Sequence, residues 1–194
     1  MIPSPVARWP ASESAAADTP DPPSPALPSP APPAAGVPAS SLRNVIVWGN
    51  HSATQYPMSK HAMAEDGAAV DAVGARLGAA WARDVMVPAV QQRGKAVIAA
   101  RGASSAASAA SAVCDHVRDL LLGSAGRVVS MAVRSDGNPY GVSPGLVFSF
   151  PVVTEAGGRW RFAGGFELDD EDRAALAKSE AELLEEREAA TSSG

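Results

Sequence analysis

Residues 44–57 have the sequence NVIVWGNHSATQYP, and this stretch decides the fold. It begins with an apolar, β-branched run at 45–47, which predicts a short buried strand. Gly49 and Asn50 interrupt that run, and such a pair is typical of the end of a strand. The next side chain, His51, is therefore expected at the C-terminal end of a strand, where an α/β fold opens its crevice.

His51 has two interpretations. A histidine at such an opening can take up and return a proton near neutral pH, because the reference pKa of its side chain is about 6.5. A histidine can also do no more than hydrogen-bond to the neighbouring backbone. The strand, the turn and the histidine taken alone favour the second interpretation, so the assignment depends on the rest of the sequence.

Residues 44–57 resemble the active-site segment of malate dehydrogenases of the cytosolic and related bacterial type, in the lactate/malate dehydrogenase superfamily. Five more segments match that family in its own order. They are VQQRG at 90–94, ARGASSAASAA at 100–110, VSMAV at 129–133, SDGNPYGV at 135–142 and FSFP at 148–151. The matches cover the C-terminal half of the family's pattern, so residues 44–194 are expected to form its C-terminal substrate domain.

The resemblance implies an NAD-dependent oxidoreductase that interconverts L-malate and oxaloacetate, a reaction of the tricarboxylic acid cycle and of carbohydrate metabolism. In that family the histidine of this segment is the catalytic acid/base, which assigns the role to His51. Asn50 and Ser104 correspond to positions near the substrate and the nicotinamide. The resemblance also implies a homodimer. Ser104 has an alternative role, because it or Ser105 can cap the helix that follows.

Several features that the family's activity requires are absent from the sequence. No G-x-G-x-x-G motif, the pattern of a dinucleotide-binding βαβ unit, follows a strand. The family's Leu-Asp-x-x-Arg motif, whose aspartate orients the histidine and whose arginine binds substrate, is also absent. Two interpretations stay open: a malate dehydrogenase catalytic domain, or a noncatalytic truncated fragment or interaction module. NADP as the cofactor and another 2-hydroxy acid as the substrate also stay open.

Residues 1–43 differ from the rest of the chain in composition. Twelve of the 17 prolines lie between Pro3 and Pro38, among many alanines and serines. Such a segment has too little apolar surface to offset the entropy lost on ordering, so we expect a disordered leader. A signal or transit peptide is poorly supported, although the leader leaves organelle targeting open.

Residue periodicity predicts the remaining elements. We expect a polar loop to about residue 64, a weakly helical region over 71–81, helices over 84–101 and 104–122, strands over 129–133, 146–152 and 160–162, and a helix over 170–189. Together they predict an α+β fold with helices packed on a small, mainly antiparallel, twisted sheet. The Leu-rich half of the 104–122 helix and Cys114 are expected in the core, and the glutamates of the last helix on a solvated face.

Charge and composition disfavour several function classes. A net charge of −5 and a pI near 5.2 argue against a nucleic-acid partner. No run approaches the eighteen consecutive apolar residues that a membrane span needs. One cysteine and three histidines lack the spacing of a metal site, so no metal is expected. A single thiol suits a reducing compartment, and the cytoplasm is the expected location.

Overall fold

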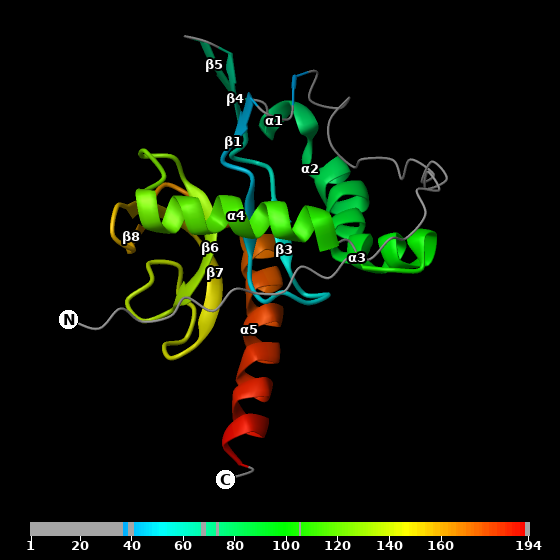
Figure 1. Ribbon diagram of the computed structural model, residues 1–194, viewed down its shortest axis with the longest axis vertical. Helices are drawn as coiled ribbons and strands as arrows, with labels where there is room; N and C mark the ends of the chain where they lie inside the picture. The colour runs from blue at the N-terminus through cyan, green and yellow to red at the C-terminus, as the bar shows by residue number, and fades with distance from the viewer. Residues whose placement is uncertain (1–36, 39–40, 67–68, 73, 105, 193–194) are drawn as a thin grey trace, which may run out of the picture.

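The structure is a computed structural model, drawn in Figure 1. It describes residues 37–38, 41–66, 69–72, 74–104 and 106–192. The expected leader therefore lies almost wholly outside the described residues. Its last two residues form a short strand, β1 (Leu42–Arg43), which pairs with β4 (Met63–Asp66).

A three-stranded antiparallel sheet supports most of the core. Its strands are β6 (Val129–Arg134), β7 (Val147–Glu155) and β8 (Arg159–Phe162). They lie in the order β6, β7, β8, so each strand pairs with its neighbour in the sequence. Along β8, Trp160 and Phe162 are half-buried whereas Arg159 and Arg161 are exposed, as expected of a strand with one solvated face.

A hairpin of β2 (Ile46–Trp48) and β3 (Tyr56–Met58) lies beside this sheet. Two backbone hydrogen bonds, of 3.2 and 2.9 Å, join Gly49 to Ser149 of β7. The Ser149 hydroxyl also donates to the carbonyl oxygen of Val47 at 2.7 Å. The hairpin is therefore fixed to β7 at the point where β2 ends.

The helical elements are α1 (Gly74–Leu77), α2 (Ala79–Trp81), the π-helical turn η2 (Ala82–Met86), α3 (Val87–Arg101), α4 (Ala106–Leu122) and α5 (Asp170–Thr191). Helices α2, η2 and α3 form one continuous helical run, and Pro88 lies just after the π-helical turn, at the place where the regular α-helical hydrogen bonding is already interrupted. Gly102 ends α3 with a φ of 68°, and its N–H donates to the Ile98 carbonyl oxygen at 2.8 Å. In Figure 1, α4 runs across the sheet and α5 extends past it to the C-terminus.

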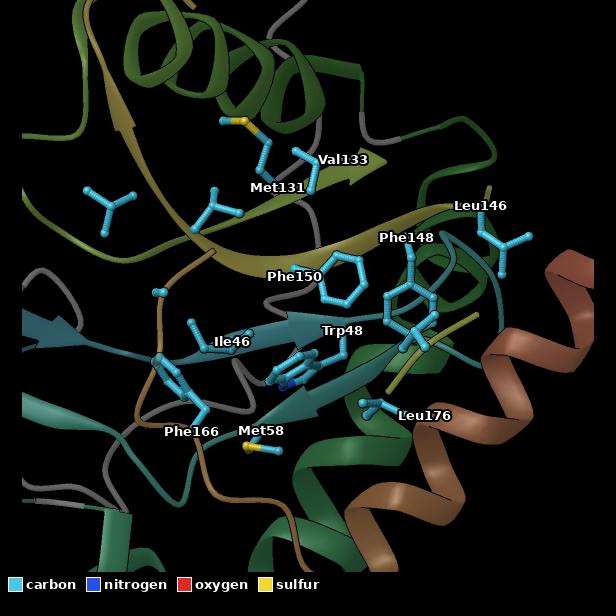
Figure 2. Close-up of a cluster of buried hydrophobic side chains, with 14 residues drawn as sticks. Ile46, Trp48, Met58, Met131, Val133, Leu146, Phe148, Phe150, Phe166 and Leu176 are labelled. Atoms are coloured by element: carbon cyan, nitrogen blue, oxygen red, sulfur yellow. The ribbon is translucent and has the colours of Figure 1, made fainter. Parts of the chain in front are cut away.

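The core fills the space between the hairpin and the sheet, as Figure 2 shows. Trp48 of β2 and Phe148 and Phe150 of β7 are completely buried. The rings of Trp48 and Phe150 meet edge to face with their centroids 6.2 Å apart, a favourable arrangement for aromatic pairs. Leu176 of α5 packs into the same cluster, so the last helix is anchored in the core.

The α+β fold with a small antiparallel sheet is confirmed. The helices α4 and α5 and the strands β6, β7 and β8 lie close to the bounds that periodicity predicts. The strand expected over 45–47 lies one residue later, and its ends, Ile46 and Trp48, are buried whereas Val45 is 40% exposed. This alternation arises because successive side chains of a strand point to opposite faces.

The prediction of a loop to residue 64 and of a weak helix over 71–81 is partly wrong. Strands β3 and β4 lie within the expected loop, and β5 (Ala69–Ala72) overlaps the start of the expected helix. These strands contain three or four residues and are held by backbone pairing. Segments that short show no clear alternation of apolar and polar residues, so their sequence carries little signal.

The second half of α4 is more exposed than predicted. Leu120 packs against the core, but Leu121 and Leu122 are 54% and 72% exposed, and Cys114 is exposed as well. The physical reason is that α4 contacts mainly β7 among the described elements, so one side of the helix stays uncovered. No described helix combines the length and the apolar character that crossing a membrane requires.

Phe150→Ala should lower the free energy of unfolding by about 3–5 kcal/mol, because it removes a buried ring and leaves a cavity. Val147→Ala on the same strand is the matched control, since that side chain is 59% exposed. Its loss should stay below about 1 kcal/mol. Urea denaturation followed by circular dichroism measures both values, and equal losses would contradict this assignment of the core.

Candidate functional site

The turn between β2 and β3 is the candidate site, because it carries His51 directly after the buried end of β2. Gly49 enters the turn with a φ of 93°, a conformation that residues with a side chain rarely adopt. A Cβ atom at this position would also lie 2.9 Å from the Cβ of Ser179 on α5. The turn therefore requires glycine both for its direction and for the close approach of α5.

His51 is exposed on this turn. Its backbone N–H donates to the side-chain oxygen of Asn50 at 2.9 Å. The structure gives the imidazole no hydrogen bond to any other described residue. The exposed ring can therefore reach a ligand or a second polypeptide at this surface.

The turn is hydrogen-bonded to one carboxylate of α5. Glu182 accepts from the hydroxyls of Ser52 and Thr54, at 2.5 and 2.6 Å, and from the side-chain amide of Asn50 at 3.3 Å. The same amide donates to Glu186 at 3.0 Å. We call Glu182 and its three donors, Asn50, Ser52 and Thr54, the glutamate clamp. Because hydrogen bonds to a charged acceptor are the stronger kind, the clamp ties both neighbours of His51 to α5.

Ser179, one helical turn before Glu182, holds the turn at a second point. Its hydroxyl accepts the backbone N–H of Asn50 at 2.8 Å and donates to the hydroxyl oxygen of Thr54 at 3.1 Å, because the one proton of the Thr54 hydroxyl is donated to Glu182. The Ser179 side chain is completely buried, and a buried polar group needs such partners. The turn is therefore held by α5, and the buried hydroxyl of Ser179 finds its hydrogen-bond partners in the turn.

The pKa of Glu182 is lowered from its usual value. The main causes are the hydrogen bonds that the hydroxyls of Ser52 and then Thr54 donate to its charged form, and they outweigh the opposing effect of burial. The clamp therefore operates with an ionised carboxylate at neutral pH.

A cavity of about 430 Å³ lies between β3, α3 and α5, and His51 does not line it. At its wall, Lys60 pairs with Asp172 and with Asp169, the latter at 3.0 Å, and the Tyr56 hydroxyl donates to Asp172 at 2.7 Å. Burial and then the bond to Asp172 raise the pKa of Tyr56. The backbone N–H of Asp172 and then Lys60 lower the pKa of Asp169 to about 2. These side chains form hydrogen bonds and ion pairs with one another, and through them α5 is joined to β3 and to the residues that follow it.

Ser104 is exposed after the end of α3. The structure shows no hydrogen bond between Ser104 and the described residues of the turn. Ser105 lies outside the described residues, between Ser104 and the start of α4. The alternative role, in which one of these serines caps α4, therefore stays a prediction. Helix α3 does reach the hairpin, because the Gln91 amide donates to the Gln55 carbonyl oxygen at 2.9 Å. Of the three predicted site residues, Asn50 and His51 are chain neighbours on the turn, and Ser104 follows α3.

Glu182 and Ser179 are functional candidates that the sequence does not reveal. The prediction that the glutamates of the last helix form a solvated face is wrong for Glu182, which is partly buried and bonded to the turn. Its partner Ser52 is 130 residues away in the sequence. The only local signal is the spacing of Ser179, Glu182 and Glu186, which places three polar side chains on one face of a helix.

The sequence matches one known domain family. Residues 33–193 match the lactate/malate dehydrogenase family, alpha/beta C-terminal domain, and the chain belongs to this family. One relative is the cytoplasmic malate dehydrogenase of Homo sapiens. The two chains are 48% identical over 154 residues, which make up 78% of this chain and 46% of the human protein.

Solved structures of lactate and malate dehydrogenases are similar to this one. The lactate dehydrogenase of Trichomonas vaginalis, in complex with NADH and oxamate, gives a TM-score of 0.75 at 31% identity, over 81% of this chain and 48% of that one. The malate dehydrogenase of Naegleria fowleri gives a TM-score of 0.70 at 35% identity, over 79% and 46%. The chain thus spans about half the length of the relatives that it matches.

The described residues do not form a dinucleotide site. Such a site is built from parallel strands connected by helices, whereas every pairing between the described strands is antiparallel. NAD, which the family resemblance implies, therefore has no binding unit of this type in the part of the chain that the structure describes. The same residues include no group of three His, Cys, Asp or Glu side chains that could hold a metal ion.

The lowered pKa of Glu182 predicts a pH-dependent contribution to stability. A carboxyl group with a lower pKa in the folded state stabilises the fold above its unfolded pKa, about 4.3 for glutamate, and loses this effect as the pH falls through the folded value. The difference in unfolding free energy between wild type and Glu182→Gln should therefore be largest above about pH 5 and shrink toward about pH 3.

Urea denaturation across this pH range measures the difference. Glu185→Gln is the matched control, because Glu185 is exposed on the same helix. It should show no such trend. A constant difference between wild type and Glu182→Gln over the whole range would contradict an ionised clamp.

Proposed function

We propose that this chain is the C-terminal catalytic domain of a malate dehydrogenase, which interconverts L-malate and oxaloacetate with NAD as the cofactor. The observation that carries the proposal is the exposed His51 on a turn that is fixed on both sides by the glutamate clamp. The 48% identity to the human cytoplasmic malate dehydrogenase supports malate as the substrate.

His51 is the proton acceptor in this proposal. Oxidation of the malate C2 hydroxyl to a ketone releases the hydroxyl proton, and an imidazole in hydrogen-bond reach can accept it and return it in the reverse reaction. Asn50 and Ser104 are assigned to the surroundings of the substrate and the cofactor. The hydrogen bond from the backbone N–H of His51 to the side-chain oxygen of Asn50 supports the assignment of Asn50.

The half of the relatives that this chain does not span supplies the remaining groups. They are a carboxylate that orients the imidazole, arginines that bind a dicarboxylate in a bidentate manner, and the dinucleotide-binding unit. The proposal also includes a homodimer and a cytoplasmic location. The homodimer rests on the family resemblance alone, and the location is supported by the human relative, which is named as a cytoplasmic enzyme.

Assembly with that half should produce activity that depends on His51. We expect NADH oxidation on addition of oxaloacetate when the chain is co-expressed with, or fused to, the part of the human enzyme that it does not span. His51→Ala should lower kcat by about 100-fold or more, because a positioned acid/base contributes about 10²- to 10⁴-fold. His116→Ala, at an exposed position of α4, is the matched control and should retain activity. Full activity in His51→Ala would contradict the proposed role.

A noncatalytic fragment or interaction module is the second candidate function. The exposed apolar side of α4 favours it, since Val113, Leu121 and Leu122 are 59%, 54% and 72% exposed. Apolar side chains that gather on a surface often mark contact with another protein. In this function the chain pairs with intact subunits through its helices and catalyses no reaction.

The chain assembled with the other half separates the two functions, because the proposed catalytic domain also needs the groups of that half. The noncatalytic function predicts no NADH oxidation with oxaloacetate even in that assembly, and it predicts binding to intact malate dehydrogenase that Leu121→Asp weakens. Arg118→Ala, an exposed change on the same helix, should leave that binding unchanged. NADH absorbance and sedimentation velocity measure the two quantities. Reduction of oxaloacetate by the chain unaided would rule out the noncatalytic function.

A further inference from the structure

We propose that Glu182 is the positioning residue for the proton transfer assigned to His51, an inference that rests on the proposed function. Glu182 holds the turn in a conformation in which His51 is exposed. It does not touch the substrate. It acts through the hydrogen bonds of the turn, from a helix at the opposite end of the sequence.

The first step in the argument is where the clamp grips the turn. Glu182 binds the residue before His51, the residue after it, and Thr54 further along. The backbone N–H of Asn50 is held separately by Ser179. The backbone on both sides of His51 is therefore held, whereas the imidazole is exposed and makes no hydrogen bond to the clamp.

The second step is the rigidity of the support. The N-terminus of α5 is closed by a capping box, in which the carboxylates of Asp169 and Asp172 each accept the other residue's backbone N–H. One face of the helix is buried, with Leu176 at 4% and Ser179 at 0% exposure. Glu182 follows Ser179 by one helical turn, so its carboxylate is carried by the buried face. The core thereby determines where the turn lies.

The third step is the chemistry of the acceptor. All three donors of the clamp converge on the same atom, Oε2 of Glu182. An ionised carboxylate only accepts hydrogen bonds, whereas a glutamine side chain presents one acceptor oxygen and an NH₂ donor group. Loss of the negative charge weakens all three hydrogen bonds at once. Charge, and not only shape, is therefore required at this position.

The consequence concerns the rate of proton transfer. An acid/base must lie within about 2.6–3.2 Å of the proton that it takes, and a displacement of about 1 Å can cost about 100-fold in rate. A turn released from α5 would still allow substrate to bind through groups elsewhere. Loss of the clamp should therefore lower kcat much more than it raises KM.

The first arm of the test uses the full chain alone and needs no activity. Amide hydrogen exchange is measured by NMR at Asn50 and Thr54, whose N–H groups donate to Ser179 and Ser52. Exchange at both should become about 10-fold faster or more in Glu182→Ala, and less so in Glu182→Gln. Amides of β7 should keep their wild-type rates, and Glu185→Gln should leave all of them unchanged.

The second arm uses the chain assembled with the half of the human enzyme that it does not span. Glu182→Ala should lower kcat for oxaloacetate reduction by about 10- to 100-fold while KM changes by less than about threefold. Glu182→Gln should have the smaller effect of the same kind. Glu185→Gln is again the control, and His51→Ala is measured in parallel.

The two arms keep the failure of the inference distinct from the failure of the proposed function. Unchanged exchange at Asn50 and Thr54 in Glu182→Ala overturns the positioning role, whatever the activity. Faster exchange with unchanged kcat also overturns it when His51→Ala abolishes activity. Activity that survives His51→Ala, or an assembly that is inactive as wild type, contradicts the proposed function, and the exchange rates then decide the clamp alone. Should Glu182→Ala fail to fold, Glu182→Gln answers both arms.

Discussion

The backbone pairing of Gly49 with Ser149 is the interaction on which the rest of the structure depends. It joins the end of β2 to the first part of β7, and both hydrogen bonds are made where β2 leaves the core. The pairing places Trp48 against the aromatic side chains of β7, so the apolar cluster and the turn are fixed together. Without this connection the hairpin would be a two-stranded unit, which is marginally stable by itself.

The glutamate clamp connects the buried core to the exposed turn that carries His51. The cluster holds the buried face of α5, α5 carries Glu182, and Glu182 holds the residues around His51. The apolar core thus controls a polar turn through one helix. This division of labour is common in enzymes, where a rigid scaffold positions reactive side chains on loops.

The sequence predicts those parts of the fold whose pattern is local. The helices α4 and α5 and the strands β6 to β8 are long or periodic enough to be found. The strands β3, β4 and β5 are too short to show a clear alternation of apolar and polar residues. The exposure of Leu122 could not be predicted, because it depends on which other elements pack against α4. Of the candidate site, the assignment of His51 and Asn50 comes from family resemblance, which no local pattern could replace. Glu182 is beyond sequence reasoning because its partners are 128 to 132 residues away.

The long separation between the turn and its anchor has a consequence for protein synthesis. Ribosomes make His51 well before Glu182, and domains can begin to fold during translation, at about 5–20 residues per second. The hairpin and most of the sheet can therefore assemble while α5 is still inside the ribosome. A product that stopped before residue 179 of this chain would contain every described strand, yet its imidazole would lie on a turn without hydrogen bonds to α5. Completion of α5 is thus the event that fixes the turn around His51.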